Sequence, residues 1–254
     1  MHIFKEVKGQ GPDVVVIHGW SCNHMDMQPV VKELAKHYRV TNIDLPGIGT
    51  SDWDPQTETI HDLAEQVLPH LPKEAIYVGW SFGGLISIAI AAKYPKRVKH
   101  LIGIGTTPKL IAADHWVGFP APGFCVAFDV VKEKGLKALL KEDYAGEFLA
   151  INPKPAQFSA LNRLLDQAPD IPQDILFKGI EICDATDLRK EFAGISCPID
   201  FIMGEDDIKV LFTSAAQLQA LNPKIKIHSI AGAKHLPFWT HPEEFNKILN
   251  CIKA

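Results

Sequence analysis

Short apolar runs alternate with helical patterns along most of this chain. Each run is short, rich in β-branched residues and stopped by Gly or Pro, which is typical of buried strands. The strands predicted in this way are 13–20, 38–47, 75–80, 98–108, 198–204 and 224–232. Helices are predicted near 26–37, 59–70, 82–94, 212–222 and 242–252. This alternation predicts an α/β fold with a mostly parallel sheet covered by helices on both faces.

The alternation stops in the middle of the chain. Residues 109–185 contain helical segments interrupted by several prolines, and no strand pattern. A stretch of this length is too long for a plain loop within a compact domain. We therefore predict one core, formed by residues 1–108 and 186–254, with a helical cap at residues 109–185 inserted over a site.

The composition narrows the classes of partner. Of 254 residues, 46% are apolar and 22% are charged, and the formal net charge is −4. This charge gives no electrostatic reason to expect nucleic acid or an anionic membrane as a partner. The start of the chain lacks a secretory signal pattern, and no apolar run of about 18 residues is present, so a cytoplasmic protein without membrane spans is expected. We also expect a monomer.

The cysteines and motifs give no reason to expect a cofactor or a metal. The five cysteines are far apart and show no CxxC spacing. Scattered reduced thiols are therefore favoured over zinc ligands or disulfides. The sequence also lacks a phosphate-loop signature and a cluster of His, Cys and Asp with ligand spacing.

Residues 79–84, GWSFGG, place Ser81 between a predicted strand and a predicted helix. A strand–turn–helix with the pattern G-x-S-x-G presents its serine on a sharp turn at the carboxyl end of a sheet. Gly79 and Gly83 suit such a turn, because a side chain at either position would crowd it. Ser81 is the candidate nucleophile, and a glycine-rich turn with an idle serine is the alternative.

A serine nucleophile needs a base, and the base needs an acid. His235 follows the last predicted strand, at the same sheet edge as Ser81. The segment GEDDIKV (204–210) follows the preceding strand and contains Glu205, Asp206 and Asp207. We favour Asp207 as the acid because of its distance from the strand end, and a solvated acidic loop is the alternative for its neighbours. The order serine, acid, histidine is that of the α/β hydrolases.

An oxyanion hole is expected to complete the site. One donor should be the backbone N–H of Phe82, the residue after the nucleophile. The other should come from the loop HGWSCNH (18–24) after the first core strand, where the N–H of Trp20 is the candidate.

Several segments resemble the α/β-hydrolase superfamily across the whole core. They are HGW (18–20), DLPGIGTSD (44–52), GWSFGG (79–84), GEDDIKV (204–210) and KHLPFWTHP (234–242). Together with GQG (9–11) and GIEICDATDLR (179–189), they resemble more narrowly the pimeloyl-acyl-carrier-protein methyl ester carboxylesterases of biotin synthesis. This resemblance implies hydrolysis of a methyl ester on a carrier-bound dicarboxylic chain to a free carboxylate and methanol.

The same resemblance implies which residues line the acyl site. These are Trp20, Phe82 and the cap segment FLAIN, that is Phe148, Leu149, Ala150, Ile151 and Asn152. It also implies an acidic carrier protein as partner, held by cap arginines. Here Asp143 and Glu147 occupy two of those positions and Arg163 keeps one. The cap lysines, which are either substitutes for the arginines or a solvated helix face, are Lys132, Lys134, Lys137, Lys141 and Lys154.

Other functions of the same fold stay open at this point. A general short-chain carboxylesterase or thioesterase, a lyase and a carbon–carbon bond hydrolase can all use a Ser–His–Asp set. A non-hydrolysing ligand receptor on this scaffold is a further alternative. Dehalogenases and epoxide hydrolases need an aspartate at the nucleophile position, and Ser81 argues against both.

Overall fold

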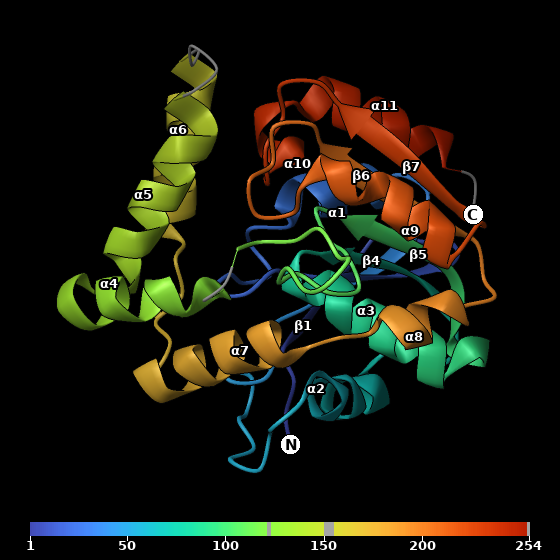
Figure 1. The fold of residues 1–254 in the computed structure, drawn as a ribbon, viewed down its shortest axis with the longest axis horizontal. Coiled ribbons are helices and arrows are strands. Elements are labelled where there is room, and N and C mark those ends of the chain that lie inside the picture. Colours follow the sequence, from blue (N-terminus) through green and yellow to red (C-terminus); the bar gives the residue numbers. More distant parts are fainter. Residues whose placement is uncertain (121–122, 150–154, 253–254) are drawn as a thin grey trace.

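A computed structural model describes residues 1–120, 123–149 and 155–252 of the chain. Its described residues contain one seven-stranded sheet with the strand order β1-β3-β2-β4-β5-β6-β7 (Figure 1). The strands are β1 (Lys5–Lys8), β2 (Asp13–Ile17), β3 (Arg39–Ile43), β4 (Ala75–Trp80), β5 (Val98–Ile104), β6 (Ile199–Gly204) and β7 (Ile225–Ile230). Within this sheet of the described residues, only β1 pairs antiparallel, with β3. The six predicted strands are therefore confirmed as a parallel set.

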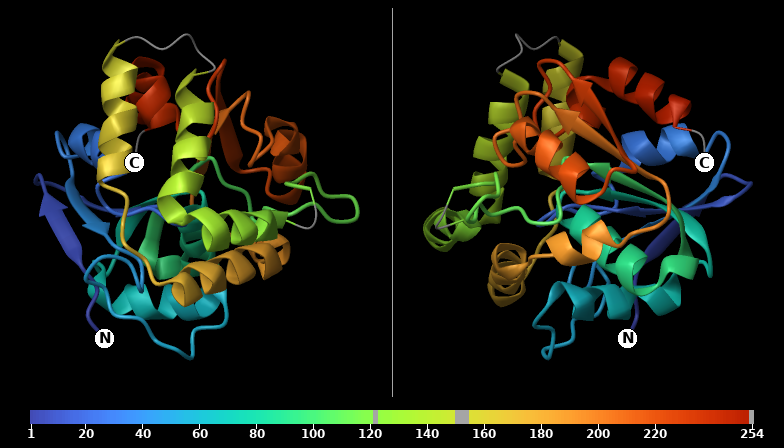
Figure 2. Two further views of the ribbon diagram at one scale, coloured as in Figure 1. Left: turned by 90° about the vertical axis from the view of Figure 1, so that its left-hand side faces the viewer. Right: turned by 45° about the vertical axis from the view of Figure 1, so that its right-hand side comes forward.

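Helices cover both faces of this sheet. The core helices are α1 (Gln28–Leu34), α2 (Ile60–Val67), α3 (Phe82–Lys93), α8 (Arg189–Ala193), α9 (Ala215–Leu221), α10 (Pro237–Thr240) and α11 (Pro242–Cys251). Helices α1 and α11 lie on one face, and α2, α3 and α8 lie on the other (Figures 1 and 2). This arrangement confirms the predicted α/β-hydrolase class of fold.

The two faces are built from alternate residues of each strand. In β2, Val14 and Val16 pack in one apolar cluster, whereas Val15 and Ile17 pack in the other. All four side chains are fully buried. Successive side chains of a strand point to opposite faces, so a strand covered on both sides becomes a continuous apolar run. This is the pattern from which the central strands were predicted.

Four of the described α-helices lie between β5 and α8. They are α4 (Val126–Lys134), α5 (Leu136–Leu149), α6 (Pro155–Asp166) and α7 (Gln173–Ala185), and we call them the cap helices. In Figure 1, α4, α5 and α6 stand to the left of the sheet and α7 passes below them. They fall within residues 109–185, the segment for which a cap is predicted. Among the described residues, no helix is long and apolar enough to cross a bilayer.

The direction in which successive strands are added to the sheet reverses at β2. The chain places β3 on one side of β2 and β4 on the other. In parallel sheets, ligands bind outside the carboxyl ends of strands at such a reversal. The loops that follow β2, β4, β6 and β7 carry the candidate residues Trp20, Ser81, Asp207 and His235. The topology therefore brings four separate segments to one edge of the sheet.

Candidate active site

Ser81 occupies a sharp turn between β4 and α3. Its backbone φ is 51° and its ψ is −116°, a conformation that residues other than glycine rarely adopt. Such a conformation costs about 1–3 kcal/mol and persists only where the surrounding structure fixes it. The Ser81 N–H donates to Ile104 O at 2.9 Å, and the Thr106 hydroxyl donates to Ser81 O at 2.9 Å. These bonds hold the turn from the neighbouring strand.

The glycines around Ser81 allow the turn to pack closely. A Cβ atom at Gly83 would overlap the carbonyl oxygens of Ile17 and His18 at the end of β2. A Cβ atom at Gly79 would overlap the Gly83 carbonyl oxygen. The turn therefore needs hydrogen at both positions, which agrees with the strand–turn–helix inferred from GWSFGG.

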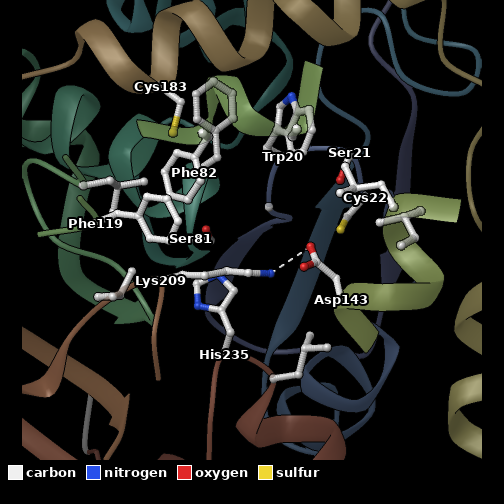
Figure 3. Close-up of a pocket in the computed structure, with 18 of the residues that line it drawn as sticks. Trp20, Ser21, Cys22, Ser81, Phe82, Phe119, Asp143, Cys183, Lys209 and His235 are labelled. Carbon is white, nitrogen blue, oxygen red and sulfur yellow. Dashed lines mark hydrogen bonds and ion pairs between the residues drawn. The ribbon is translucent and has the colours of Figure 1, made fainter. Parts of the chain in front are cut away.

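His235 and Asp207 form a buried pair. The distance between His235 Nδ1 and Asp207 Oδ2 is 2.7 Å, and the two residues are 5% and 3% exposed. An ionised carboxylate only accepts hydrogen bonds, so the imidazole proton lies on Nδ1 and leaves Nε2 with a lone pair. His235 and Ser81 line the same cavity, as Figure 3 shows. In the neutral imidazole, Nε2 is then the basic nitrogen, in a side chain that lines the same cavity as Ser81.

Asp207 differs sharply from the two acids that precede it. Its Oδ1 accepts hydrogen bonds from the backbone N–H groups of Lys209 and Val210, at 2.8 and 3.1 Å. Burial alone would raise the pKa of Asp207, but His235 and these hydrogen bonds bring the pKa below its usual value. Glu205 and Asp206 are exposed. Asp207 is therefore the carboxylate of this loop that contacts the histidine.

His18 fixes the loop that carries Trp20. Its Nε2 accepts from Leu45 N at 3.0 Å, so Nδ1 carries the proton and donates to Gly19 O at 2.7 Å. Burial lowers the pKa of His18, which keeps the ring neutral. In a trans peptide the C=O and N–H point in opposite directions. The Trp20 N–H thus points away from His18, on the opposite side of the Gly19–Trp20 peptide.

The second expected donor is the N–H of Phe82, which lies at the first position of α3. The first N–H groups of a helix have no acceptor within the helix, so they are available to a ligand. The side chains of Trp20 and Phe82 also line the cavity beside Ser81 (Figure 3). Both backbone donors thus belong to segments that border the same space.

A cavity of about 340 Å³ adjoins Ser81 and His235. The core contributes the loops after β2, β4, β6 and β7, and residues 109–185 contribute the segment before α4 together with residues of α4, α5 and α7. Most of the lining side chains are apolar, among them Phe119, Phe124, Val130, Leu139, Leu140 and Ile180. Such a cavity suits a chain of methylene groups better than a polar ligand.

The predicted acyl-site segment FLAIN is only partly described. Phe148 is 1% exposed and packs in the apolar cluster with Leu140 and Tyr144, and it is not among the residues that line the cavity. Leu149 ends α5. Ala150, Ile151 and Asn152 lie outside the described residues, as does Lys154. The described residues of 109–185 that line the cavity come instead from the segment before α4, from α4 and α7, and from earlier turns of α5.

Three charged residues in the cavity wall were not expected there. Lys209 Nζ lies 2.9 Å from Asp143 Oδ2 on α5, and Figure 3 shows this pair beside the cavity. Glu147, one turn further along α5, is 5% exposed and also lines the cavity. Charged residues on a helix are usually solvated, so the sequence pattern gave no sign of their inward position.

Trp80 supports the loop of His235. Its indole Nε1 donates to the His235 carbonyl oxygen at 2.9 Å, and the two rings lie 5.6 Å apart. Trp80 is 3% exposed, so its ring is buried in the core. Its hydrogen bond adds a link between the serine turn and the histidine loop that sequence reasoning did not identify.

Two thiols also line the cavity, those of Cys22 and Cys183. Burial raises the pKa of both thiols above the usual value. A protonated thiol is a weak nucleophile, so Ser81 stays the candidate nucleophile of the cavity. Within the described ranges, no group of three His, Cys, Asp or Glu side chains is arranged to hold a metal ion.

Comparison with known proteins places this chain in a family. The model of the alpha/beta hydrolase fold family matches residues 12–242. Among solved structures, the bromoperoxidase from Bacillus anthracis is similar, with a TM-score of 0.86 and 26% identity over 98% of this chain and 94% of that chain.

Two curated relatives are similar over almost their whole length. The pimeloyl-[acyl-carrier protein] methyl ester esterase of Pseudoalteromonas atlantica is 31% identical over 241 residues, which is 93% of this chain and 92% of that protein. The protein of the same name from Aeromonas hydrophila is 31% identical over 250 residues, which is 98% of each chain. The chain belongs to the α/β-hydrolase family and, within it, to the family of pimeloyl-[acyl-carrier protein] methyl ester esterases.

Proposed function

We propose that this chain is a serine carboxylesterase that cleaves the methyl ester of pimeloyl-acyl-carrier protein, with Ser81, His235 and Asp207 as its catalytic triad. The observation that supports it most is the hydrogen-bonded pair of His235 and Asp207 in the cavity that Ser81 lines. The names of its relatives supply the proposed substrate.

The first half of the reaction forms an acyl-enzyme. His235 Nε2 takes the proton of the Ser81 hydroxyl as Ser81 Oγ attacks the ester carbonyl carbon. The N–H groups of Trp20 and Phe82 stabilise the oxyanion of the tetrahedral intermediate. The intermediate then expels the alkoxide, which leaves as methanol with the proton from His235.

The second half releases the acid. His235 takes a proton from a water molecule, which attacks the acyl-enzyme carbonyl carbon. The new tetrahedral intermediate expels Ser81 Oγ, which recovers its proton from His235. The product is a carboxylic acid at the end of the acyl chain, which releases its proton to solvent as the free carboxylate. Asp207 remains ionised throughout and stabilises the imidazolium that forms in each half.

We propose that residues 109–185 act as the cap that selects the acyl chain. The apolar side chains of α4, α5 and α7 in the cavity wall support this, because each buried methylene contributes about 0.8 kcal/mol. Trp20 and Phe82 would contact the acyl chain from the core side. An aliphatic chain that reaches the surface would leave its far end available for attachment to a carrier.

The carrier protein would dock on the cap. The lysines of α4 and α5 are exposed, namely Lys132, Lys134, Lys137 and Lys141. Such charges attract an acidic partner and mainly accelerate association.

The cysteines Cys22, Cys183, Cys197 and Cys251 are unpaired. We therefore place the reaction in the reducing cytoplasm.

Labelling with a serine-directed phosphonate tests the proposed nucleophile. The wild-type protein should take up one label, on Ser81, and Ser81→Ala should take up none while keeping its melting temperature. A label on another residue would contradict the triad. Growth of a biotin auxotroph that lacks its methyl esterase tests the substrate, since the wild-type chain should restore growth and Ser81→Ala should not.

A further inference from the structure

Helix α5 is bonded directly to the loops that carry His235 and Asp207. The carboxylate of Glu147 accepts a hydrogen bond from Leu236 N at 3.2 Å, and Leu236 is the residue after His235. One turn earlier, the carboxylate of Asp143 holds the Lys209 ammonium at 2.9 Å. Lys209 lies two residues beyond Asp207, so α5 contacts both catalytic loops.

A third bond strengthens the same attachment. Lys234 Nζ donates to the carbonyl oxygen of Gly146 on α5 at 2.9 Å. Lys234 precedes His235, so α5 binds the chain on both sides of the histidine. Cap and core are thus joined by polar contacts within two residues of His235 and Asp207, in addition to the apolar packing of the cap.

Glu147 is the least exposed of the charged side chains in these contacts. It is 5% exposed, and burial raises the pKa of its carboxyl group, while the charges of His235 and Lys209 favour the ionised form. The negative charge of Asp207 opposes ionisation. Burial of a carboxylate carries a large desolvation cost unless the group is hydrogen-bonded or paired. The bond from Leu236 N to Glu147 offsets part of this cost.

Charged and hydrogen-bonding groups face Glu147 from two loops of the core. His235 and the Leu236 N–H face it from the loop after β7, and Asp207 and Lys209 act on it from the loop after β6. On its own helix, Asp143 already pairs with Lys209. The imidazole of His235 is consequently placed near two carboxylates, Asp207 in the core and Glu147 in the cap.

We propose that Glu147 is a positioning residue for His235, through its bond to the Leu236 N–H and through its charge beside the imidazole. The proposal rests on the proposed function, because it assigns a role within the same site. It makes the cap part of the catalytic machinery: α5 must be seated for the histidine loop to hold its working geometry.

The bond and the charge have separable effects. The bond restrains the loop of His235 and so supports kcat. The charge stabilises the imidazolium that forms during the reaction. Hydrolysis needs the neutral imidazole, hence removal of the charge should move the acid limb of the kcat/KM profile to lower pH.

Three variants separate these effects. Glu147→Gln keeps an oxygen acceptor for Leu236 N and removes the charge, whereas Glu147→Ala removes both. Glu142→Gln is the matched control, because Glu142 lies on the same helix, is exposed, and is 3.8 Å from Lys134 on the surface. The substrate is a short p-nitrophenyl ester, measured from pH 5 to pH 9, with the melting temperature of each variant.

We expect Glu147→Gln to shift the acid limb down by about half a pH unit or more, and Glu142→Gln to leave it in place. Glu147→Ala should show the same shift and in addition lose about tenfold in kcat, with KM little changed. A Glu147→Gln variant whose pH profile matches that of the wild type would overturn the proposal. Wild-type protein that does not hydrolyse the ester would instead count against the proposed function itself.

Discussion

At the scale of single residues, Asp207 and Asp206 provide a test of the proposed acid. They are neighbours in the chain, but Asp207 is buried and bonded to His235 Nδ1, whereas Asp206 is exposed. Asp207→Asn should reduce kcat about ten-thousandfold, because the imidazole loses its orientation and its counter-charge. Asp206→Asn should change kcat little. The reverse ranking of the two variants would move the role of acid to Asp206.

Trp80 allows a second test, because another tryptophan serves as its control. Trp80→Phe leaves the His235 carbonyl oxygen without its indole donor, a loss of about 1 kcal/mol. Trp239→Phe removes a similar bond, from Trp239 Nε1 to Asp26 O at 2.8 Å. Both variants should melt at a lower temperature, but only Trp80→Phe should also lose kcat, by several fold. Equal kcat losses would show that the Trp80 bond has no special effect on the histidine.

The positions of some of these residues in the site could be inferred from the sequence, and the positions of others could not. Ser81, Asp207 and His235 were inferred because each follows a predicted strand, and parallel strands end at one sheet edge. Glu147 and Lys209 were not inferred as cavity residues, since charged side chains are exposed in most proteins. The bond from Trp80 joins residues 155 positions apart, and no local pattern encodes such a contact.

At the scale of elements, the exposed lysines of the cap test where the carrier docks. Lys137→Glu together with Lys141→Glu, both on α5, should raise KM for a carrier-bound ester about tenfold at low salt. The reason is that an acidic partner loses attraction and meets like charge. Turnover of a free ester should stay unchanged. Lys96→Glu, a change at an exposed residue of η2 (Pro95–Arg97) in the core, is the control.

A cap variant that binds the carrier-bound ester as well as Lys96→Glu does would place the docking surface elsewhere.

Elements of the core were predicted more fully than those of the cap. The central strands are continuous apolar runs because both of their faces are buried. The longer core helices have enough residues to show a helical spacing of apolar positions. The strand β1 was missed because KEVK is polar and lies at the sheet edge, where pairing needs no apolar run. Helix α10 has only four residues, too few for a helical period. The cap helices pack partly on a cavity, so their apolar positions do not show which turns line it.

At the scale of the whole molecule, one buried acid should contribute to the way stability changes with pH. Burial raises the pKa of Asp26 from 3.8 to about 7. The folded protein therefore holds a proton that the unfolded chain has lost between about pH 4 and pH 7, so the contribution of Asp26 to stability falls as pH rises. This change amounts to about 1.4 kcal/mol per unit of pKa difference.

Asp26→Asn should remove that contribution. The difference in unfolding free energy between wild type and variant, measured by urea denaturation from pH 5 to pH 8, should shift in favour of the variant as pH rises. Asp114→Asn, at an exposed site, should show a constant difference. A constant difference for Asp26→Asn as well would mean that Asp26 is ionised over the whole range.

The most direct test of the account is the specificity of ester hydrolysis. The methyl ester of pimeloyl-acyl-carrier protein and free dimethyl pimelate should be compared by kcat/KM, with Ser81→Ala beside the wild type. We predict that the wild type prefers the carrier-bound ester, that the preference falls with salt, and that Ser81→Ala cleaves neither. Equal kcat/KM for the two esters at every salt concentration, or cleavage by Ser81→Ala, would contradict the account.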